Sequence, residues 1–417
     1  MADASTQPLI QVRDLYKVFG PDPEAVMPLV RGGRSKDDIL AETGHTVGLN
    51  DINLDIQRGE IFVIMGLSGS GKSTLIRHFN RLIDPTAGSI LVDGVDVMSL
   101  SRPELEHFRQ HKMSMVFQRF GLLPHCNVLE NVAFGLTIQK VPKAERDEKA
   151  MEWLKTVGLE GYERQFPAQL SGGMQQRVGL ARALCTDPDI LLMDEAFSAL
   201  DPLIRSGMQD QLIELQDRLQ KTIVFITHDL DEALRLGDKI AILKDGVLSQ
   251  IGRPEEILLN PADAYVEAFV RDVNRARVLS VGVVMQPPNC RLTAKNIDEA
   301  LKQMRSWPED YGYLFQGNEY MGVVSQAALE EACQSTPGAS PLLEDVCEDG
   351  PSLAPDSNLE DALPATLDSD FPVPILSEDG EYQGTLSRQD MITALAHAET
   401  ADSDPAATNS TKSKSAA

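Results

Sequence analysis

A glycine-rich segment in the first quarter of the chain has the residue types and spacing to hold phosphate groups. The segment GLSGSGKST runs from Gly66 to Thr74 and fits the pattern G-x-x-x-x-G-K-[ST]. It follows the apolar run IFVIM, which predicts a buried strand, and precedes the helical pattern STLIRHFNRL, as this motif requires. Its glycines allow backbone N–H groups to wrap phosphate oxygens, and the helix start adds partial positive charge. We expect the nucleotide to be contacted by Gly66, Ser68, Gly69, Gly71, Lys72, Ser73 and Thr74.

Two acids at the end of a second apolar run add hydrolytic chemistry. Lys72 is expected to reach the β- and γ-phosphates, and the Ser73 hydroxyl to bind Mg²⁺. In ILLMDEAFSALD, residues 190–201, Asp194 is expected to hold Mg²⁺ through its water shell. Glu195 follows it and is suited to orient or deprotonate the attacking water. Without a phosphate loop these would be solvated acids at a strand end, and with one they predict hydrolysis of a nucleoside triphosphate.

Two further polar residues, Gln118 and His228, end apolar runs. Gln118 closes MSMVFQ and His228 lies in IVFITHD. Taken alone, such a histidine is a structural cap and such a glutamine carries no meaning. Phosphoryl transfer depends on positioning and on charge neutralisation, so both side chains are candidates to point at the γ-phosphate.

A second glycine turn, LSGGMQQR, runs from Leu170 to Arg177. It leads into a helix and therefore has the form of another phosphate-binding turn. The chain nevertheless offers only one complete nucleotide pocket, so the turn needs a phosphate from elsewhere.

The elements that must position these residues predict an α/β core. Residues 8–20 alternate like a strand, and residues 21–48 interrupt the pattern with a short helix, capped by Ser35 and stopped by Gly44. Two strands with a turn at Arg58-Gly59 follow, and strands and helices then alternate to about residue 270.

A second region, from about 276 to 400, carries an internal repeat. EYMGVVSQAAL, from Glu319, recurs as EYQGTLSRQDM, from Glu381, 62 residues later. An amphipathic helix precedes each copy, so two small units are expected to pair around a shared core. The helices are marked by Ile297, Ala300, Leu301 and Met304 and by Leu359, Ala362 and Leu363.

The composition is acidic, with a net charge of -25. Residues 276–400 contain 6 Lys and Arg but 21 Asp and Glu. This charge opposes binding to nucleic acid and direct adsorption to anionic lipid, although acidity could also serve solubility alone. Five scattered cysteines indicate a reducing compartment, and neither a signal peptide nor a transmembrane run is expected.

The order of these motifs resembles the ATPase subunit of ATP-binding-cassette (ABC) transporters over about residues 8–270, with LSGGMQQR as the most specific element. The resemblance implies a P-loop NTPase core with a helical subdomain, ATP and Mg²⁺ as ligands, and a homodimer of ATPase subunits. In such dimers the signature turn of one subunit closes over the γ-phosphate held by the other. Ser171, Gly172 and Gly173 would therefore complete a partner's site.

The resemblance also implies roles for single residues. Phe19 resembles the aromatic residue that stacks on adenine, unless it is a core phenylalanine. Gln118 would bind Mg²⁺ or the attacking water, Glu195 would be the general base and His228 the γ-phosphate contact. Asp201, in SALD, would communicate across the dimer.

The insertion at 21–48 and the segment THDLDEALRLGDKIAI look like the importer class for glycine betaine, proline and related quaternary amines. The repeat is similar to a tandem pair of cystathionine-β-synthase-type (CBS) modules, at 276–335 and 340–400, before a disordered tail at 401–417. Ser387 and Asp390 match the S-x-x-D pattern that contacts ribose, whereas Ala328 replaces the acid in the first copy. One adenine nucleotide at most, or a purely structural pair, is therefore expected.

The expected function is ATP hydrolysis that energises import of an osmoprotectant, with regulation by the CBS pair. The expected partners are two integral membrane permease subunits and, indirectly, a periplasmic or extracellular substrate-binding protein, with the chain on the cytoplasmic face of the inner membrane. Alternatives are import of choline, carnitine or proline, a soluble cassette ATPase of DNA repair or translation, and a non-hydrolysing sensor. The short gap between Lys72 and Ser171, the single phosphate loop and the acidic composition oppose the soluble cassette ATPase, and Glu195 opposes the sensor.

Overall fold

The structure is a computed structural model that describes residues 7–118, 120–335 and 342–396. These residues divide into two compact units, one ending at Val270 and one beginning at Arg271. The tail expected at 401–417 lies outside the described residues. Within the described ranges, no helix is both long enough and apolar enough to cross a membrane.

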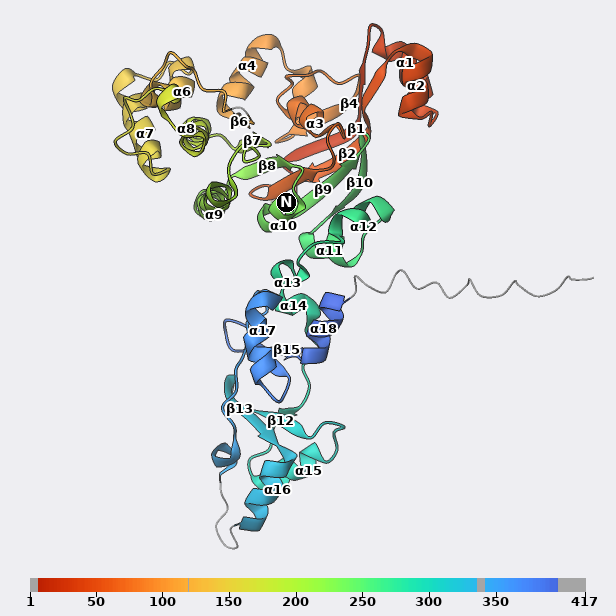
Figure 1. Ribbon diagram of the computed structural model, residues 1–417, viewed down its shortest axis with the longest axis vertical. Helices are drawn as coiled ribbons and strands as arrows, with labels where there is room; N and C mark the ends of the chain where they lie inside the picture. The colour runs from red at the N-terminus through yellow and green to blue at the C-terminus, as the bar shows by residue number, and fades with distance from the viewer. Residues whose placement is uncertain (1–6, 119, 336–341, 397–417) are drawn as a thin grey trace, which may run out of the picture. The chain divides into compact units, whose positions relative to one another are not determined.

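A six-stranded sheet with the order β10-β9-β3-β8-β7-β6 lies at the centre of the first unit (Figure 1). Its strands are β3 (Ile61–Met65), β6 (Met113–Phe117), β7 (Ile190–Asp194), β8 (Thr222–Thr227), β9 (Lys239–Lys244) and β10 (Val247–Gly252). All neighbouring strands are parallel except β9 and β10. Strands β3, β7 and β8 are buried along their whole length, as their continuous apolar runs predict. The connecting helices include α3 (Lys72–Phe79), α4 (Arg102–His111), α9 (Pro202–Leu219) and α10 (Leu230–Leu236).

A four-stranded antiparallel sheet packs beside this core with the order β2-β1-β4-β5. Its strands are β1 (Ile10–Phe19), β2 (Thr46–Ile56), β4 (Ala87–Val92) and β5 (Val95–Asp96). The insertion between β1 and β2 forms two helices, α1 (Pro23–Arg31) and α2 (Lys36–Thr43). The cap and the stop predicted for α2 are confirmed, because Ser35 accepts from the Asp38 N–H and Gly44 has a φ of 71°. Helix α1 was not expected; Pro23 suits its first turn, where no N–H is needed.

A group of helices lies at the end of the first unit opposite α1 and α2 (Figure 1). These helices are α5 (Val128–Val132), α6 (Phe134–Ile138), α7 (Lys143–Thr156) and α8 (Gly172–Leu184). They bury an apolar core of their own, which includes Val128, Leu154 and Val178. Helices α11 (Pro254–Leu259) and α12 (Ala264–Val270) end the unit.

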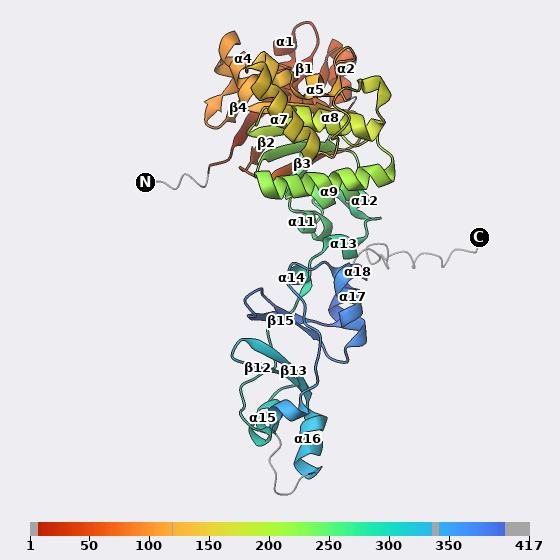
Figure 2. The same ribbon diagram turned by 90° about the vertical axis from the view of Figure 1, so that its left-hand side faces the viewer.

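The second unit repeats one pattern of helix, two strands and helix (Figure 2). The first copy contains β11 (Arg291–Leu292), α15 (Ile297–Met304), β12 (Tyr311–Gln316), β13 (Glu319–Ser325) and α16 (Gln326–Ser335). The second contains α17 (Leu359–Asp368), β14 (Val373–Leu376), β15 (Tyr382–Leu386) and α18 (Arg388–Ala396), and α13 (Arg275–Val278) and α14 (Val281–Val284) precede both copies.

The two copies exchange backbone pairs across the unit. Gln286, which precedes the first copy, exchanges two backbone hydrogen bonds with Thr385 of the second, at 2.8 and 3.0 Å. Glu348, which precedes the second copy, does the same with Val323 of the first, at 3.0 and 2.9 Å. Gln286 and Glu348 are 62 positions apart, and so are Val323 and Thr385, so the exchange follows the 62-residue sequence repeat. Each copy is therefore completed by a segment that leads into the other.

A cluster of aromatic side chains fills the space that the two copies share. Tyr313 of the first copy is fully buried, and its hydroxyl donates to the Pro372 carbonyl of the second at 2.6 Å. The Tyr382 hydroxyl donates in return to the Asn289 carbonyl at 2.7 Å. The shared core predicted from the repeat is present.

Candidate functional site

The chemical groups predicted from sequence lie at the ends of adjacent strands. Strands β3, β8, β7 and β6 are consecutive neighbours and run parallel. Their carboxyl ends therefore meet at one edge of the sheet, where open α/β sheets bind ligands. The phosphate loop follows β3, His228 follows β8, Glu195 follows β7 and Gln118 follows β6. Four segments far apart in sequence are thus brought into one row.

The phosphate loop connects β3 to α3 in a conformation that only glycine tolerates. Gly66 and Gly71 have φ values of 147° and 103°. A Cβ atom on Gly66 would lie 2.2 Å from the Leu243 carbonyl oxygen, and one on Gly71 would lie 2.7 Å from that of Gly48. Backbone of the core therefore packs directly against the loop.

Lys72 begins α3 and is buried under the loop. Its ammonium group donates to the Gly66 carbonyl at 2.8 Å and to the Leu67 carbonyl at 3.1 Å. Burial lowers the pKa of Lys72, while the nearby carboxylates of Glu195 and Asp194 act in the opposite direction. The ammonium is therefore held by neutral carbonyl groups, next to the space where phosphates would lie.

Ser73 and Asp194 form a pair of oxygen donors beside Lys72. The Ser73 hydroxyl donates to Asp194 Oδ1 at 2.7 Å, and Arg77 lies 3.3 Å from Asp194 Oδ2. Asp194 is only 5% exposed. A hydroxyl and a carboxylate are the kind of ligands that Mg²⁺ takes from a protein when a nucleotide and water supply the rest.

Glu195 lies between two other candidate catalytic groups. Its Oε2 accepts a hydrogen bond from Gln118 Nε2 at 3.2 Å and lies 3.4 Å from His228 Nδ1. Glu195 also has a φ of 48°, in the left-handed region that few residues other than glycine adopt. Strained backbone of this kind clusters at functional sites, and here it sets the direction of the carboxylate.

A cavity of about 300 Å³ lies over the phosphate loop. The predicted residues that line it are Phe19, Ser68, Gly69, Gly71, Lys72, Ser73, Thr74 and Glu195. Phe19 is 40% exposed, which favours a stacking platform over a core position. Gly66, Gln118 and His228 do not line the cavity. Gln118 and His228 each contact Glu195, which does line it.

Sequence reasoning missed several residues of this site. Lys36, Thr46, Val47 and Gly48 also line the cavity. The Tyr265 hydroxyl supports the loop from below, because it accepts from the Leu67 N–H and donates to the Leu243 carbonyl, both at 3.3 Å. No sequence motif contains these residues. The one available signal concerns Lys36, because the insertion that carries it directly follows Phe19, the expected adenine contact.

The second glycine turn does not line this cavity. Ser171 caps α8 and accepts from the Met174 N–H at 3.4 Å, and Gly172 and Gly173 form the first turn of that helix. Ser171 and Gly172 are exposed. Asp201 caps α9 in the same manner, accepting from the Ile204 N–H at 3.1 Å. The turn is therefore an exposed helix start, and none of its residues lines the cavity over the phosphate loop of its own chain.

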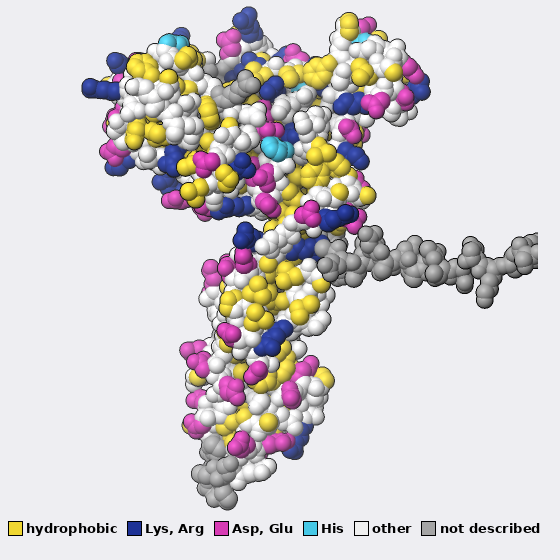
Figure 3. Space-filling model, viewed as in Figure 1, with side chains coloured by type: hydrophobic (Ala, Val, Ile, Leu, Met, Phe, Trp, Pro, Cys, Tyr) yellow, Lys and Arg dark blue, Asp and Glu magenta, His cyan; other side chains and the backbone are white. Residues whose placement is uncertain are grey.

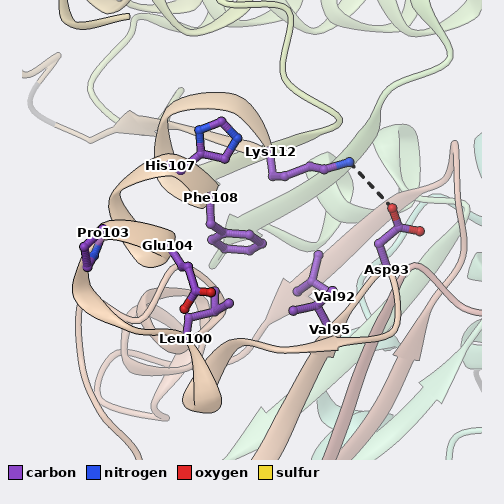
Figure 4. A pocket seen from close by; sticks show the side chains of 9 residues that line it. All are labelled: Val92, Asp93, Val95, Leu100, Pro103, Glu104, His107, Phe108 and Lys112. Atoms are coloured by element: carbon purple, nitrogen blue, oxygen red, sulfur yellow. Dashed lines mark ion pairs between the residues drawn. The ribbon is translucent and has the colours of Figure 1, made fainter.

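A larger cavity, of about 440 Å³, lies between β4 and α4 (Figure 4). Its wall is mainly apolar, with Val92, Leu100 and Phe108 pointing inward, and Lys112 at its rim lies 3.6 Å from Asp93. It holds neither a glycine loop nor an acid-and-hydroxyl pair, so it is not the phosphate site.

The S-x-x-D residues of the second repeat bond to each other. Asp390 Oδ2 accepts from the Ser387 N–H at 2.9 Å and from its hydroxyl. Asp390 Oδ1 accepts from Gln286 Nε2 at 2.9 Å. Both oxygens of the acid are therefore occupied, one of them by the segment that crosses from the first copy.

Comparison with known proteins gives four informative likenesses. The family model described as ABC transporter matches residues 49–198. The glycine betaine transport ATP-binding protein OpuAA of Bacillus subtilis is 47% identical over 93% of this chain and 92% of its own. The glycine betaine/proline betaine transport system ATP-binding protein ProV of Escherichia coli is 46% identical over 93% and 97%. A solved dimer of the ATP-binding cassette MJ0796, in a post-hydrolysis state bound to ADP and Pi, is 33% identical over 59% of this chain and 98% of that one, with a TM-score of 0.51.

Proposed function

Because the chain belongs to the family of ABC transporter ATP-binding proteins, we propose that it hydrolyses ATP to energise import of glycine betaine, proline betaine and related osmoprotectants. The observation that carries this proposal is the likeness to two such transport proteins over nearly the whole chain. The row of phosphate loop, Glu195, His228 and Gln118 at one sheet edge supports the hydrolytic part of it.

The two phosphate-binding turns belong to one composite site in this proposal. Two copies of the chain associate head to tail, and Ser171, Gly172 and Gly173 of one copy close over the γ-phosphate on the loop of the other. The exposed position of Ser171 and Gly172 at the start of α8 favours this arrangement, since a helix N-terminus binds anions. ATP then contributes to holding the dimer together, and Asp201 communicates across it.

Each group at the sheet edge has one task in this proposal. Lys72 exchanges its bonds to the loop carbonyls for phosphate oxygens, and Phe19 stacks on adenine. Glu195 accepts the proton of the attacking water. Gln118 holds the Glu195 carboxylate in position, and His228 contacts the γ-phosphate. Ser73 and Asp194, with Gln118, would hold Mg²⁺, which would supply charge neutralisation for the phosphates.

The membrane partners are proposed to be two permease subunits, with a substrate-binding protein outside, so that the chain acts on the cytoplasmic face of the membrane. The segment from Phe117 to Leu136 is the proposed contact, because Gln118 links it to Glu195. Arg182 braces it by donating to the Gly121 carbonyl at 2.6 Å. Phe117 and Phe134, 38% and 39% exposed, offer apolar surface for a permease within this segment.

The repeat region is proposed to be a regulatory CBS pair that responds to osmotic or ionic conditions. Acidic side chains spread over its visible face, where ionic strength would act (Figure 3). An adenine nucleotide at Ser387 and Asp390 would have to displace Gln286 from the acid. The interlocked copies could also serve as a structural pair without a ligand.

Loss of Lys72 tests the transport function. In cells at high osmolarity, Lys72→Ala is expected to abolish uptake of labelled glycine betaine, because the phosphates lose their buried cation. Lys143→Ala, at an exposed position in α7, is the matched control and should transport normally. If neither variant changes uptake, the solute is a different one, and choline, proline and carnitine are measured next.

Deletion of residues 276–417 tests the regulatory role. The remaining chain keeps the whole first compact unit, so ATP hydrolysis should persist. The dependence of transport on external salt is expected to flatten. Salt dependence identical to that of the full chain would show that the repeat region does not sense ionic conditions.

A further inference from the structure

The insertion between β1 and β2 presents one unpaired cation to the nucleotide cavity. It carries three cations, Arg31, Arg34 and Lys36. The Arg31 guanidinium lies over the Tyr16 ring at 5.6 Å, and Arg34 pairs with Glu42. Lys36 lines the cavity over the phosphate loop and makes no hydrogen bond or ion pair within the described part of the chain. Lys36 is partly buried, and an ammonium group with no partner among the described residues gains most from an anionic ligand.

The insertion is fastened so that Lys36 stays near the cavity. At its neck, the His45 ring packs on Gly20, where any Cβ atom would lie 2.1 Å from that ring. His45 Nδ1 also bonds to the Thr43 carbonyl at 2.9 Å. The two helices bury apolar side chains against the ends of β1 and β2, namely Val26, Met27, Val30 and Ile39 against Val18 and Val47. The start of α2, where Lys36 lies, is thereby held in place.

The residues that line the cavity include two sets that bind different groups. Phe19 and Thr46 pair with each other where β1 ends and β2 begins, and Phe19 offers a ring for stacking. Lys72 and the loop glycines offer a cation and backbone N–H groups. If adenine stacks on Phe19 and the loop holds the β- and γ-phosphates, the α-phosphate is the anionic group that remains for Lys36 of the insertion.

We propose that Lys36 binds the α-phosphate of the nucleotide, so that the insertion is part of the ATP site. This inference rests on the proposed function, because it places ATP in this cavity. Lys36 supplies a charge to the ground state and touches none of the reacting groups. It therefore sets nucleotide affinity and leaves the hydrolytic step alone.

Titration of the full chain with ATP and with ADP tests the proposal. Lys36→Met keeps the unbranched side chain, one atom shorter, and removes the charge, and it is expected to raise the Kd of both nucleotides about tenfold. The KM for ATP should rise by a similar factor with kcat unchanged. Affinity should also depend less steeply on salt, since one ionic contact is gone. Lys36→Arg should restore binding, and Arg34→Met, which breaks the ion pair with Glu42 inside the insertion, is the matched control.

Three results would overturn the inference. One is unchanged affinity in Lys36→Met, and another is an equal loss in Arg34→Met, which would mark a structural role of the insertion. The third is a loss for ATP without a loss for ADP, which would place Lys36 at the γ-phosphate. Failure of the native chain to bind ATP would instead overturn the proposed function itself.

Discussion

Glu195→Gln is expected to slow ATP hydrolysis by about 10²–10⁴-fold while ATP stays bound. The glutamine keeps the size of the side chain and its contacts with Gln118 and His228, but it cannot accept the proton of the attacking water. A nucleotide that is bound and not cleaved should hold two copies together. Gel filtration with ATP and Mg²⁺ is expected to show a dimer for this variant and phosphate release to show almost no turnover.

The control for this variant is Glu214→Gln, an exposed position on α9. It removes the same charge away from the strand ends and should hydrolyse ATP at the native rate. A Glu195→Gln chain that elutes as a monomer with ATP would count against the head-to-tail dimer. Near-native turnover would instead mean that another group serves as the base.

Ser171→Arg is expected to abolish hydrolysis and to spare ATP binding. Ser171 lies at the exposed start of α8, away from the cavity over its own phosphate loop. A large side chain there should keep the turn from closing on a partner's γ-phosphate, whereas the loop with Lys72 stays intact. ATP affinity is measured by titration and hydrolysis by phosphate release. A Ser171→Arg chain that still hydrolyses ATP would exclude the composite site.

Loss of the helix cap is a separate effect of this substitution and needs its own control. Ser101 is the N-cap residue of α4, where its N–H and its hydroxyl donate to the Glu104 carboxylate, and it lies outside the proposed site. Ser101→Arg should cost about 1 kcal/mol of stability, as loss of a serine cap does, and should leave hydrolysis at the native rate.

Mixing two inactive variants gives the sharpest test of the shared site. A dimer of one Lys72→Ala copy and one Ser171→Arg copy contains one site in which both halves are native. Equal mixing should therefore restore up to about a quarter of the native activity, because half of the dimers are mixed and each has one intact site of two. If each chain carried its whole site, the mixture would stay inactive.

Contiguous motifs explain how much of the site could be predicted. GLSGSGKST, Asp194 with Glu195, and LSGGMQQR each occupy a few neighbouring positions, and each needs its residue types for a reason of local backbone geometry or charge. Strands β3, β7 and β8 could be predicted from the sequence because both faces of each strand are buried, which requires a continuous apolar run. Helix α1 was not predicted. Pro28 lies inside it, where proline ordinarily interrupts a helix, whereas Pro23 lies in its first turn, where no N–H is needed.

The sequence by itself determined which residues could carry phosphate chemistry, that the core is α/β and that a small unit is repeated. Only the tertiary structure decided which distant residues meet: Lys36 at the nucleotide cavity, Tyr265 under the phosphate loop and Gln286 on Asp390. The physical reason is that such contacts depend on how separate elements pack and on backbone hydrogen bonds, which nearly every residue type can make. Local geometry can be predicted from the residue types and spacing within a motif, whereas contacts between separate elements cannot be predicted from a single sequence in this way.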